Sequence, residues 1–186
     1  LLQIKINVDS MPVFARTKLY MEEYCLTHYR PRVEMTFTGP NPQNVYPKLV
    51  DILTRNVAVP RENIQEKGFK WDRSGATETF SASMETVKDF DKFSYMYLVI
   101  DVAGSIKPSK EFGKEGSVTI IIEGRVVTEY PQDTVWERSF LYEVFRMFYH
   151  RVLYQDQRYK YLQNCREWMI VMQDELKSFF NVLQKA

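Results

Sequence analysis

Residues 95–102 read YMYLVIDV, and this stretch decides the fold class. Every second position is apolar, with Met96, Leu98, Ile100 and Val102 in alternation with two tyrosines, a valine and an aspartate. A period of two residues is typical of a β-strand that buries one face and leaves the other in a more polar setting. The stretch therefore predicts a half-buried strand.

The same alternation recurs on both sides of this stretch, so residues 63–130 are predicted to form four strands. The linkers between them are short, whereas parallel pairing needs a crossover of a dozen or more residues. We therefore expect an antiparallel sheet, which can keep one face wet. The residues expected to share a face are Phe69 and Trp71 in the first strand, Phe80, Ala82 and Met84 in the second, and Val118, Ile120, Ile122 and Val126 in the fourth.

The first third of the chain predicts strands followed by short helices. Residues 1–38 alternate in the manner of strands, although part of 15–26 is also compatible with a short helix. Residues 41–58 carry apolar side chains at helical spacing, and Asn41 suits the N-cap of a helix. Because Pro47 lies inside this pattern, we expect two short helices or one helix that restarts there.

Residues 134–184 predict a C-terminal helical segment, because their apolar side chains recur every three or four positions. Thr134 and Glu137 have the spacing of a capping box at its start. An unbroken helix of this length would extend ~75 Å, against a radius of gyration of ~16 Å for a compact chain of this size. The segment is therefore expected to bend near the polar residues 155–158, or to project as an arm. The predicted fold is a single α+β domain over residues 1–186, with an antiparallel sheet packed on a long, broken C-terminal helix.

Composition excludes several classes of protein. The chain has 186 residues, of which 45% are hydrophobic and 26% are charged, and its formal net charge is +1. Near-neutral charge argues against a nucleic-acid partner, and no apolar run approaches the ~18 residues of a membrane span. Cys25 and Cys165 are too few for a disulfide framework or a metal site. We interpret Cys165 as a buried free thiol on the apolar stripe of the helix and expect a cytoplasmic protein.

The order of a strand, short helices, antiparallel strands and a long final helix resembles the helix-grip arrangement of START and Bet v 1-like proteins. The similar part runs from Arg32 to the C-terminus. Residues 1–31 add strands that this arrangement lacks, its usual strands outnumber the four predicted here, and the glycine-rich loop of plant Bet v 1 relatives has no clear equivalent. The resemblance implies an apolar cavity that binds a lipid, a sterol or an aromatic molecule, or a co-chaperone-like protein surface.

The sequence contains none of the common motifs of nucleotide binding, hydrolysis or metal catalysis. We therefore expect a non-enzymatic binding protein with a cavity between sheet and helix for a hydrophobic or lipid-like small molecule, and predict no catalytic residue, metal or cofactor. The predicted lining residues are Phe69, Trp71, Phe80, Met84, Met96, Leu98, Ile120, Ile122, Phe145 and Phe148.

The alternative is a protein–protein interaction or assembly subunit, with a protein partner or a second copy as its target. Tyrosine is amphipathic and suits interfaces, and the C-terminal segment carries more of it than a core needs. The predicted interaction surface consists of Tyr142, Tyr149, Tyr154, Tyr159 and Tyr161.

A third possibility is a cavity enzyme that uses Asp101 or His150 as a general base. Asp101 shares a face with Tyr95 and Tyr97. If that face lined a cavity, burial would raise the pKa of the Asp101 carboxyl; if the face is wet, Asp101 is an ordinary solvated aspartate. His150 is equally compatible with a structural histidine on a helix face.

Overall fold

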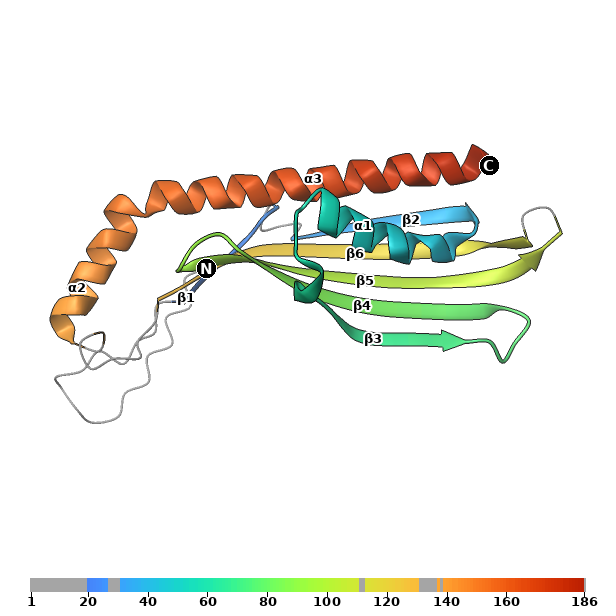
Figure 1. Ribbon diagram of the computed structural model, residues 1–186, viewed down its shortest axis with the longest axis horizontal. Coiled ribbons are helices and arrows are strands. Elements are labelled where there is room, and N and C mark those ends of the chain that lie inside the picture. The colour runs from blue at the N-terminus through green and yellow to red at the C-terminus, as the bar shows by residue number, and fades with distance from the viewer. Residues whose placement is uncertain (1–19, 27–30, 111–112, 131–136, 138, 186) are drawn as a thin grey trace.

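The computed structural model describes residues 20–26, 31–110, 113–130, 137 and 139–185, and within them it shows an α+β fold, as the sequence predicts (Figure 1). The strands are β1 (Tyr20–Tyr24), β2 (Arg32–Pro40), β3 (Ile64–Asp72), β4 (Glu78–Asp89), β5 (Ser94–Ser109) and β6 (Gly113–Glu129). The helices are α1 (Val45–Arg55), α2 (Phe140–Phe148) and α3 (Gln155–Lys185), with 3-10 turns at Pro42–Asn44 and Arg61–Asn63 and a π-helical turn at Tyr149–Leu153.

The strands form one antiparallel sheet in the order β1-β6-β5-β4-β3. β2 also pairs with β6, from Glu115 to Glu123, while β1 pairs with the next part of β6, from Arg125 to Glu129. β1 and β2 therefore follow one another along the same side of β6. β3 is at the other edge of the sheet.

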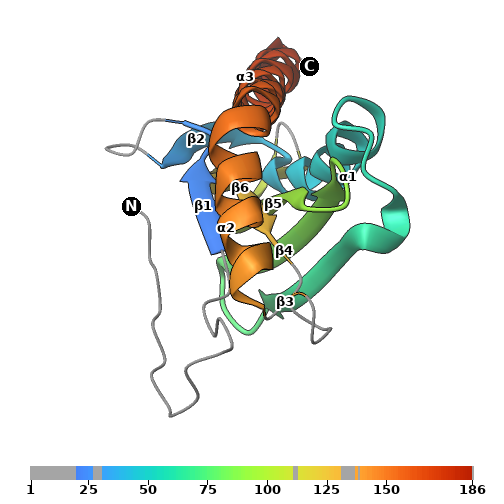
Figure 2. The same cartoon turned by 90° about the vertical axis from the view of Figure 1, so that its left-hand side faces the viewer.

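One face of the sheet is covered by α3 and α1, which lie beside each other (Figures 1 and 2). The aliphatic face of β5 points into this layer, where Met96, Leu98, Ile100 and Val102 are at most 1% exposed. The alternation along the strands thus identifies the core side correctly. The buried residues that α3 contributes are Cys165, Met169, Met172, Leu176 and Phe180.

A disulfide joins Cys25, which follows β1, to Cys165 in α3, with 5.4 Å between their Cα atoms. The interpretation of Cys165 as a free thiol is therefore wrong. The two residues are 140 positions apart, and only the pairing of β1 with β6 beneath α3 brings them together. The backbone N–H of Cys25 donates to the carbonyl of Gly124, 2.9 Å away. A Cβ atom on Gly124 would lie 3.0 Å from the sulfur of Met169, so the glycine leaves α3 room to approach β6.

The helical break expected at Pro47 is absent, since a 3-10 turn leads into one continuous α1. Pro47 is the third residue of α1, where a backbone N–H has no partner within the helix, so its missing donor disrupts nothing.

The C-terminal segment does bend, at residues 149–154, immediately before the polar stretch that begins at Gln155. The predicted capping residue Thr134 lies outside the described residues, as do the strands expected before Tyr20. Ser139 instead caps α2, because its Oγ accepts a hydrogen bond from the N–H of Tyr142 at 3.2 Å. Among the helices that are described, none is long and apolar enough to cross a membrane.

Candidate functional site

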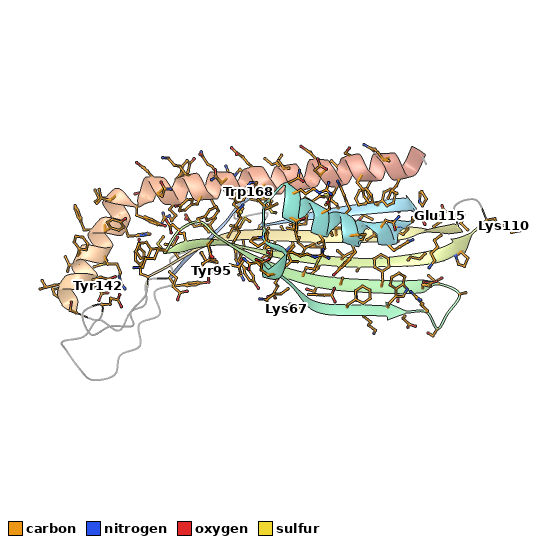
Figure 3. The ribbon with its side chains drawn as sticks, in the orientation of Figure 1. Lys67, Tyr95, Lys110, Glu115, Tyr142 and Trp168 are labelled. Carbon is orange, nitrogen blue, oxygen red and sulfur yellow. A yellow bond between two sulfur atoms is a disulfide. The ribbon has the colours of Figure 1, made fainter. Side chains whose placement is uncertain are left out.

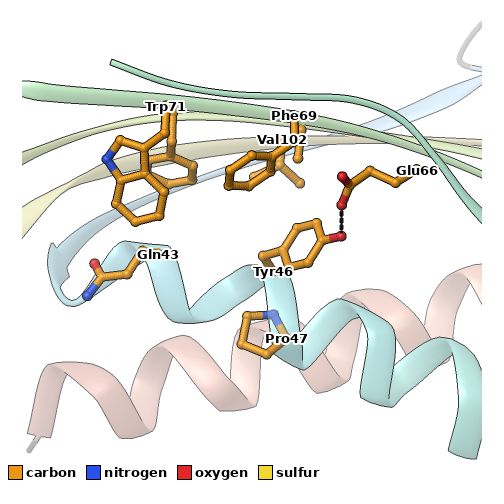
Figure 4. Close-up of a pocket in the computed structure, with 9 residues that line it drawn as sticks. Gln43, Tyr46, Pro47, Glu66, Phe69, Trp71 and Val102 are labelled. Atoms are coloured by element: carbon orange, nitrogen blue, oxygen red, sulfur yellow. Dashed lines mark hydrogen bonds between the residues drawn. The ribbon is translucent and has the colours of Figure 1, made fainter. Parts of the chain in front are cut away.

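An apolar groove of about 420 Å³ opens between α1 and the β3 edge of the sheet (Figure 4). It forms because α3 packs over β2 and β6, at the opposite edge, so the covered layer does not extend fully over β3. We call it the α1–β3 groove. Its lining residues are Gln43, Tyr46, Pro47, Glu66, Phe69, Trp71, Phe80, Ala82 and Val102.

Four aromatic rings form a continuous wall in the groove. The ring centroids of Tyr46 and Phe69 are 6.0 Å apart, those of Phe69 and Trp71 6.2 Å, and those of Trp71 and Phe80 5.8 Å. Phe69 remains 51% exposed, so part of this wall is open to an incoming molecule. Gly104 makes room for the Phe80 ring, since a Cβ atom there would come within 2.5 Å of it.

Two polar groups lie among these rings. The amide oxygen of Gln43 is buried and accepts no hydrogen bond from any described residue, while its amide nitrogen donates to Asn41 at 3.3 Å. The hydroxyl of Tyr46 donates to the Glu66 carboxylate (Figure 4). Burial and this hydrogen bond raise the pKa of Tyr46 to about 12, so the phenol stays neutral. The groove thus combines apolar walls with one free acceptor.

The indole of Trp71 is held in place at the rim of the groove. Its Nε1 donates to the Glu78 carboxylate at 2.9 Å, and this bond is the largest cause of the lowered pKa of Glu78. The guanidinium of Arg73 lies 4.4 Å from the centroid of the indole, and Lys114 pairs with Glu78 at 3.2 Å. Such contacts fix the orientation of the indole ring.

Three of the ten residues predicted to line a cavity do so, namely Phe69, Trp71 and Phe80. The structure does not bring all ten together around this groove. Alternation identifies the core face of a strand, but not which part of that face a helix covers. Met84, Met96, Leu98, Ile120 and Ile122 are buried in the core and do not line the groove. Phe145 and Phe148 lie on α2 and are 64% and 58% exposed.

Local side-chain spacing does not indicate the α1 side of the groove. Gln43 and Tyr46 lie outside the apolar stripe of the short helix, and Glu66 resembles an ordinary edge-strand carboxylate. Only the docking of α1 beside β3 reveals that these side chains share one groove.

The predicted tyrosine surface does not exist as an exposed patch. Tyr154 is only 4% exposed, and its hydroxyl donates to Asp91 at 2.8 Å. Tyr161 donates to the same carboxylate at 2.8 Å and stacks on Phe90, with 4.5 Å between ring centroids. Tyr142 and Tyr149 are half-buried, whereas Tyr159 is 59% exposed.

Asp91 connects the β4–β5 turn to the start of α3. Besides the two tyrosines, it accepts hydrogen bonds from the N–H groups of Phe93 and Ser94 at 2.8 and 2.9 Å. Burial works to raise the pKa of Asp91, but these hydrogen bonds outweigh it and lower the pKa overall. Two of the tyrosines chosen from the sequence, Tyr154 and Tyr161, are thus anchors within the fold.

His150 lies at the bend between α2 and α3, with both ring nitrogens engaged. Its Nδ1 is 3.2 Å from the hydroxyl of Tyr130, and its Nε2 is 2.8 Å from the guanidinium of Arg158. Burial, followed by the charges of Arg158 and Arg146, lowers the pKa of His150 to about 4. A neutral histidine with no free nitrogen fits a structural role and leaves no site for a substrate proton.

Asp101 is exposed on the sheet face that points away from the helices, which is the solvated alternative considered above. It accepts a hydrogen bond from the hydroxyl of Ser83 at 2.7 Å. Tyr95, on the same face, projects from the side of the sheet opposite to Trp168 of α3 (Figure 3). In the part of the chain that is described, no three His, Cys, Asp or Glu residues lie close enough to hold a metal ion.

A second unusual surface lies on α2 and the π-helical turn. Its side chains are apolar, yet each is between 47% and 70% exposed. We call this surface the outer face of α2. It consists of Phe140, Leu141, Val144, Phe145, Met147, Phe148, Val152 and Leu153.

Comparisons with known proteins supply no function. No protein-family model matches the chain, and no curated protein matches it. Among solved structures, a protein of unknown function from Staphylococcus aureus is similar at 9% sequence identity and a TM-score of 0.30. The match covers 91% of this chain and 98% of that one. These findings do not bear on the helix-grip resemblance, which stays a prediction.

Proposed function

We propose that this chain is a non-enzymatic binding protein that takes an apolar, aromatic small molecule in the α1–β3 groove. The observation that carries the proposal is the wall of four aromatic rings around a cavity of about 420 Å³. Small-molecule sites are typically ~300–1,000 Å³ in volume, mostly apolar, with few polar groups that orient the ligand. The groove has this composition, and Phe69 offers an open ring face for stacking.

The polar end of the groove narrows the class of ligand. The buried amide oxygen of Gln43 is an acceptor without a partner among the described residues. An unsatisfied buried acceptor costs ~1–3 kcal/mol, which a donor on the ligand would recover. The ligand is therefore a flat apolar molecule that carries one hydroxyl or N–H group.

A matched pair of compounds tests both features. Naphthol carries an aromatic body and a hydroxyl donor, whereas its methyl ether keeps the body and loses the donor. We expect naphthol to bind in calorimetry and to shift the indole N–H resonance of Trp71, with the ether about 10-fold weaker. Equal affinities would show that Gln43 does not accept a hydrogen bond from the ligand. The absence of a shift at Trp71 with either compound would refute the groove proposal.

A pair of variants provides the structural control. Phe69→Ala removes an exposed ring from the groove and is expected to weaken naphthol binding about 10-fold. Tyr159→Ala removes a ring of comparable exposure from α3 and is expected to leave binding unchanged. Similar losses in both variants would show that naphthol adheres to aromatic surface in general.

We also propose that the protein resides in an oxidising compartment. The sequence predicted a cytoplasmic protein, but the Cys25–Cys165 disulfide favours an oxidising compartment, because cytosolic thiols are generally kept reduced. Because both cysteines are fully buried, alkylation of the denatured protein before and after reduction tests this. Two cysteines that react only after reduction support the oxidising compartment, and two that react without it restore the cytoplasmic prediction.

A further inference from the structure

The α2 helix turns its polar side toward the rest of the protein. Arg146 is only 3% exposed and pairs with Glu143, whose side chain is 19% exposed, at 3.4 Å. Tyr142 and Tyr149 are half-buried on the same side, and His150 continues it into the contacts with Tyr130 described above. The helix is therefore fastened by polar groups, the reverse of what a surface helix normally does.

Its apolar side faces outward. Phe140, Val144 and Phe148 succeed one another at intervals of four residues, and Leu141 and Phe145 lie beside them. Residues at this spacing share one side of a helix. Their exposed fractions run from 47% for Val144 to 70% for Phe140. The segment presents an unbroken apolar strip at one end of the elongated molecule, where α2 crosses the end of the sheet (Figure 2).

The area of this strip is that of a protein interface. The eight side chains of the outer face expose roughly 1,000 Å² together, at ~200 Å² for a fully exposed large apolar residue. The largest apolar patch on a typical monomer is ~300–600 Å². A standard interface buries ~800 Å² on each partner. The outer face of α2 is thus large enough to support a stable dimer.

Its shape fits a second copy of the same helix. Two convex helices pack ridge into groove around a two-fold axis, which needs no concave partner. An antiparallel pair whose axis passes beside residues 146 and 147 brings position 145 of one copy opposite position 148 of the other, so the exposed rings of Phe145 and Phe148 meet.

We propose that the outer face of α2 is a homodimer interface, in which two α2 helices cross antiparallel with Phe145 and Phe148 at the centre. This assembly is independent of the α1–β3 groove, which lies at another edge of the sheet.

Sedimentation velocity of the intact chain tests the proposal. The unaltered protein is expected to be a dimer at micromolar concentrations, and the double variant Phe145→Ser with Phe148→Ser a folded monomer, with the dissociation constant raised about 100-fold or more. As a matched control, Ile170→Ser with Val171→Ser removes two exposed apolar side chains of α3 and should leave the dimer intact. Circular dichroism verifies that each variant is folded.

The lipid alternative is tested separately. A protein that stays monomeric at ~100 µM overturns the proposal. If this monomer also cosediments with vesicles of phosphatidylglycerol and phosphatidylcholine through Phe145 and Phe148, the occupant of the face is a lipid surface instead.

Discussion

The helices α2 and α3 come from one continuous stretch of sequence with the same three-and-four spacing of apolar residues, yet they use it in opposite ways. In α3 this stripe is buried on the sheet, with Met172 and Leu176 both 0% exposed. In α2 it points outward, with Phe145 64% and Phe148 58% exposed. The sheet extends beneath α3, whereas α2 turns away at the bend and crosses its end (Figure 1). Periodicity therefore defines an apolar face but not what covers it.

Truncation in the two helices should produce the largest difference. Leu176→Ala leaves a cavity beneath α3 and is expected to lower the free energy of unfolding by about 2–5 kcal/mol. Phe145→Ala removes an exposed side chain and should change it by no more than about 0.5 kcal/mol in the monomer. Urea denaturation at low protein concentration measures both. Comparable losses would mean that α2 is packed against part of its own chain.

Reduction of the disulfide should be the next largest effect, because Cys25–Cys165 ties α3 to the sheet edge near β1. The bond closes a loop of 140 residues, so reduction is expected to lower the free energy of unfolding by about 2–4 kcal/mol. Denaturation with and without dithiothreitol measures this, and the Cys25→Ser, Cys165→Ser variant should be insensitive to the reductant. An unchanged midpoint in the native protein would indicate that the bond does not constrain the unfolded chain.

Acidification should act on the bend between the two helices. The pKa of His150 is about 4 in the fold, against 6.5 as the ordinary value. Between these values the unfolded chain binds a proton that the folded chain does not, so stability is complete above pH 6.5 and falls as pH drops toward 4. We expect a loss of roughly 2 kcal/mol from this group, allowing for its partial exposure.

The His150→Gln variant isolates this contribution. Glutamine does not titrate, so the variant should lose less stability than the unaltered protein between pH 6.5 and pH 4. Urea denaturation at several pH values measures this loss. Identical pH profiles for the variant and the unaltered protein would show that Tyr130 and Arg158 do not hold the neutral ring as the structure indicates.

The smallest effect is expected at the start of α2. Ser139→Ala removes the side-chain acceptor for the N–H of Tyr142, and N-cap losses cost about 1 kcal/mol. Because α2 is peripheral, we expect faster amide exchange within α2 and an almost unchanged global unfolding transition. Ser139→Asp keeps an acceptor and should retain the protection. Equal exchange rates in the unaltered protein and the two variants would contradict the role of Ser139 as the N-cap of α2.

Local chemistry made much of the fold predictable. Alternation in residues 95–102 correctly identified the apolar face of β5 that is buried, because a strand has only two sides. Short linkers correctly predicted antiparallel neighbours. The error at Pro47 was one of position, since proline disrupts a helix interior but not a first turn.

The candidate sites were less predictable. Phe69, Trp71 and Phe80 were found from strand alternation, but Gln43 and Tyr46 belong to the groove only because α1 docks beside β3. Tyr154 belongs to a tyrosine-rich segment of the kind that suits interfaces, yet its hydroxyl donates to Asp91 inside the fold. Contacts between residues far apart in the chain leave no signal in local spacing.

The sequence by itself determined the α+β class, the antiparallel strands, the long C-terminal helical segment and the side of each strand that is apolar. These follow from side-chain periodicity, which is a local property of the chain. The tertiary structure alone decided that Cys25 meets Cys165, that the sheet face is left open beside β3, and that the apolar side of α2 points away from the protein. Each of these depends on where elements come together in space, which is set by the packing of the whole sheet and its helices.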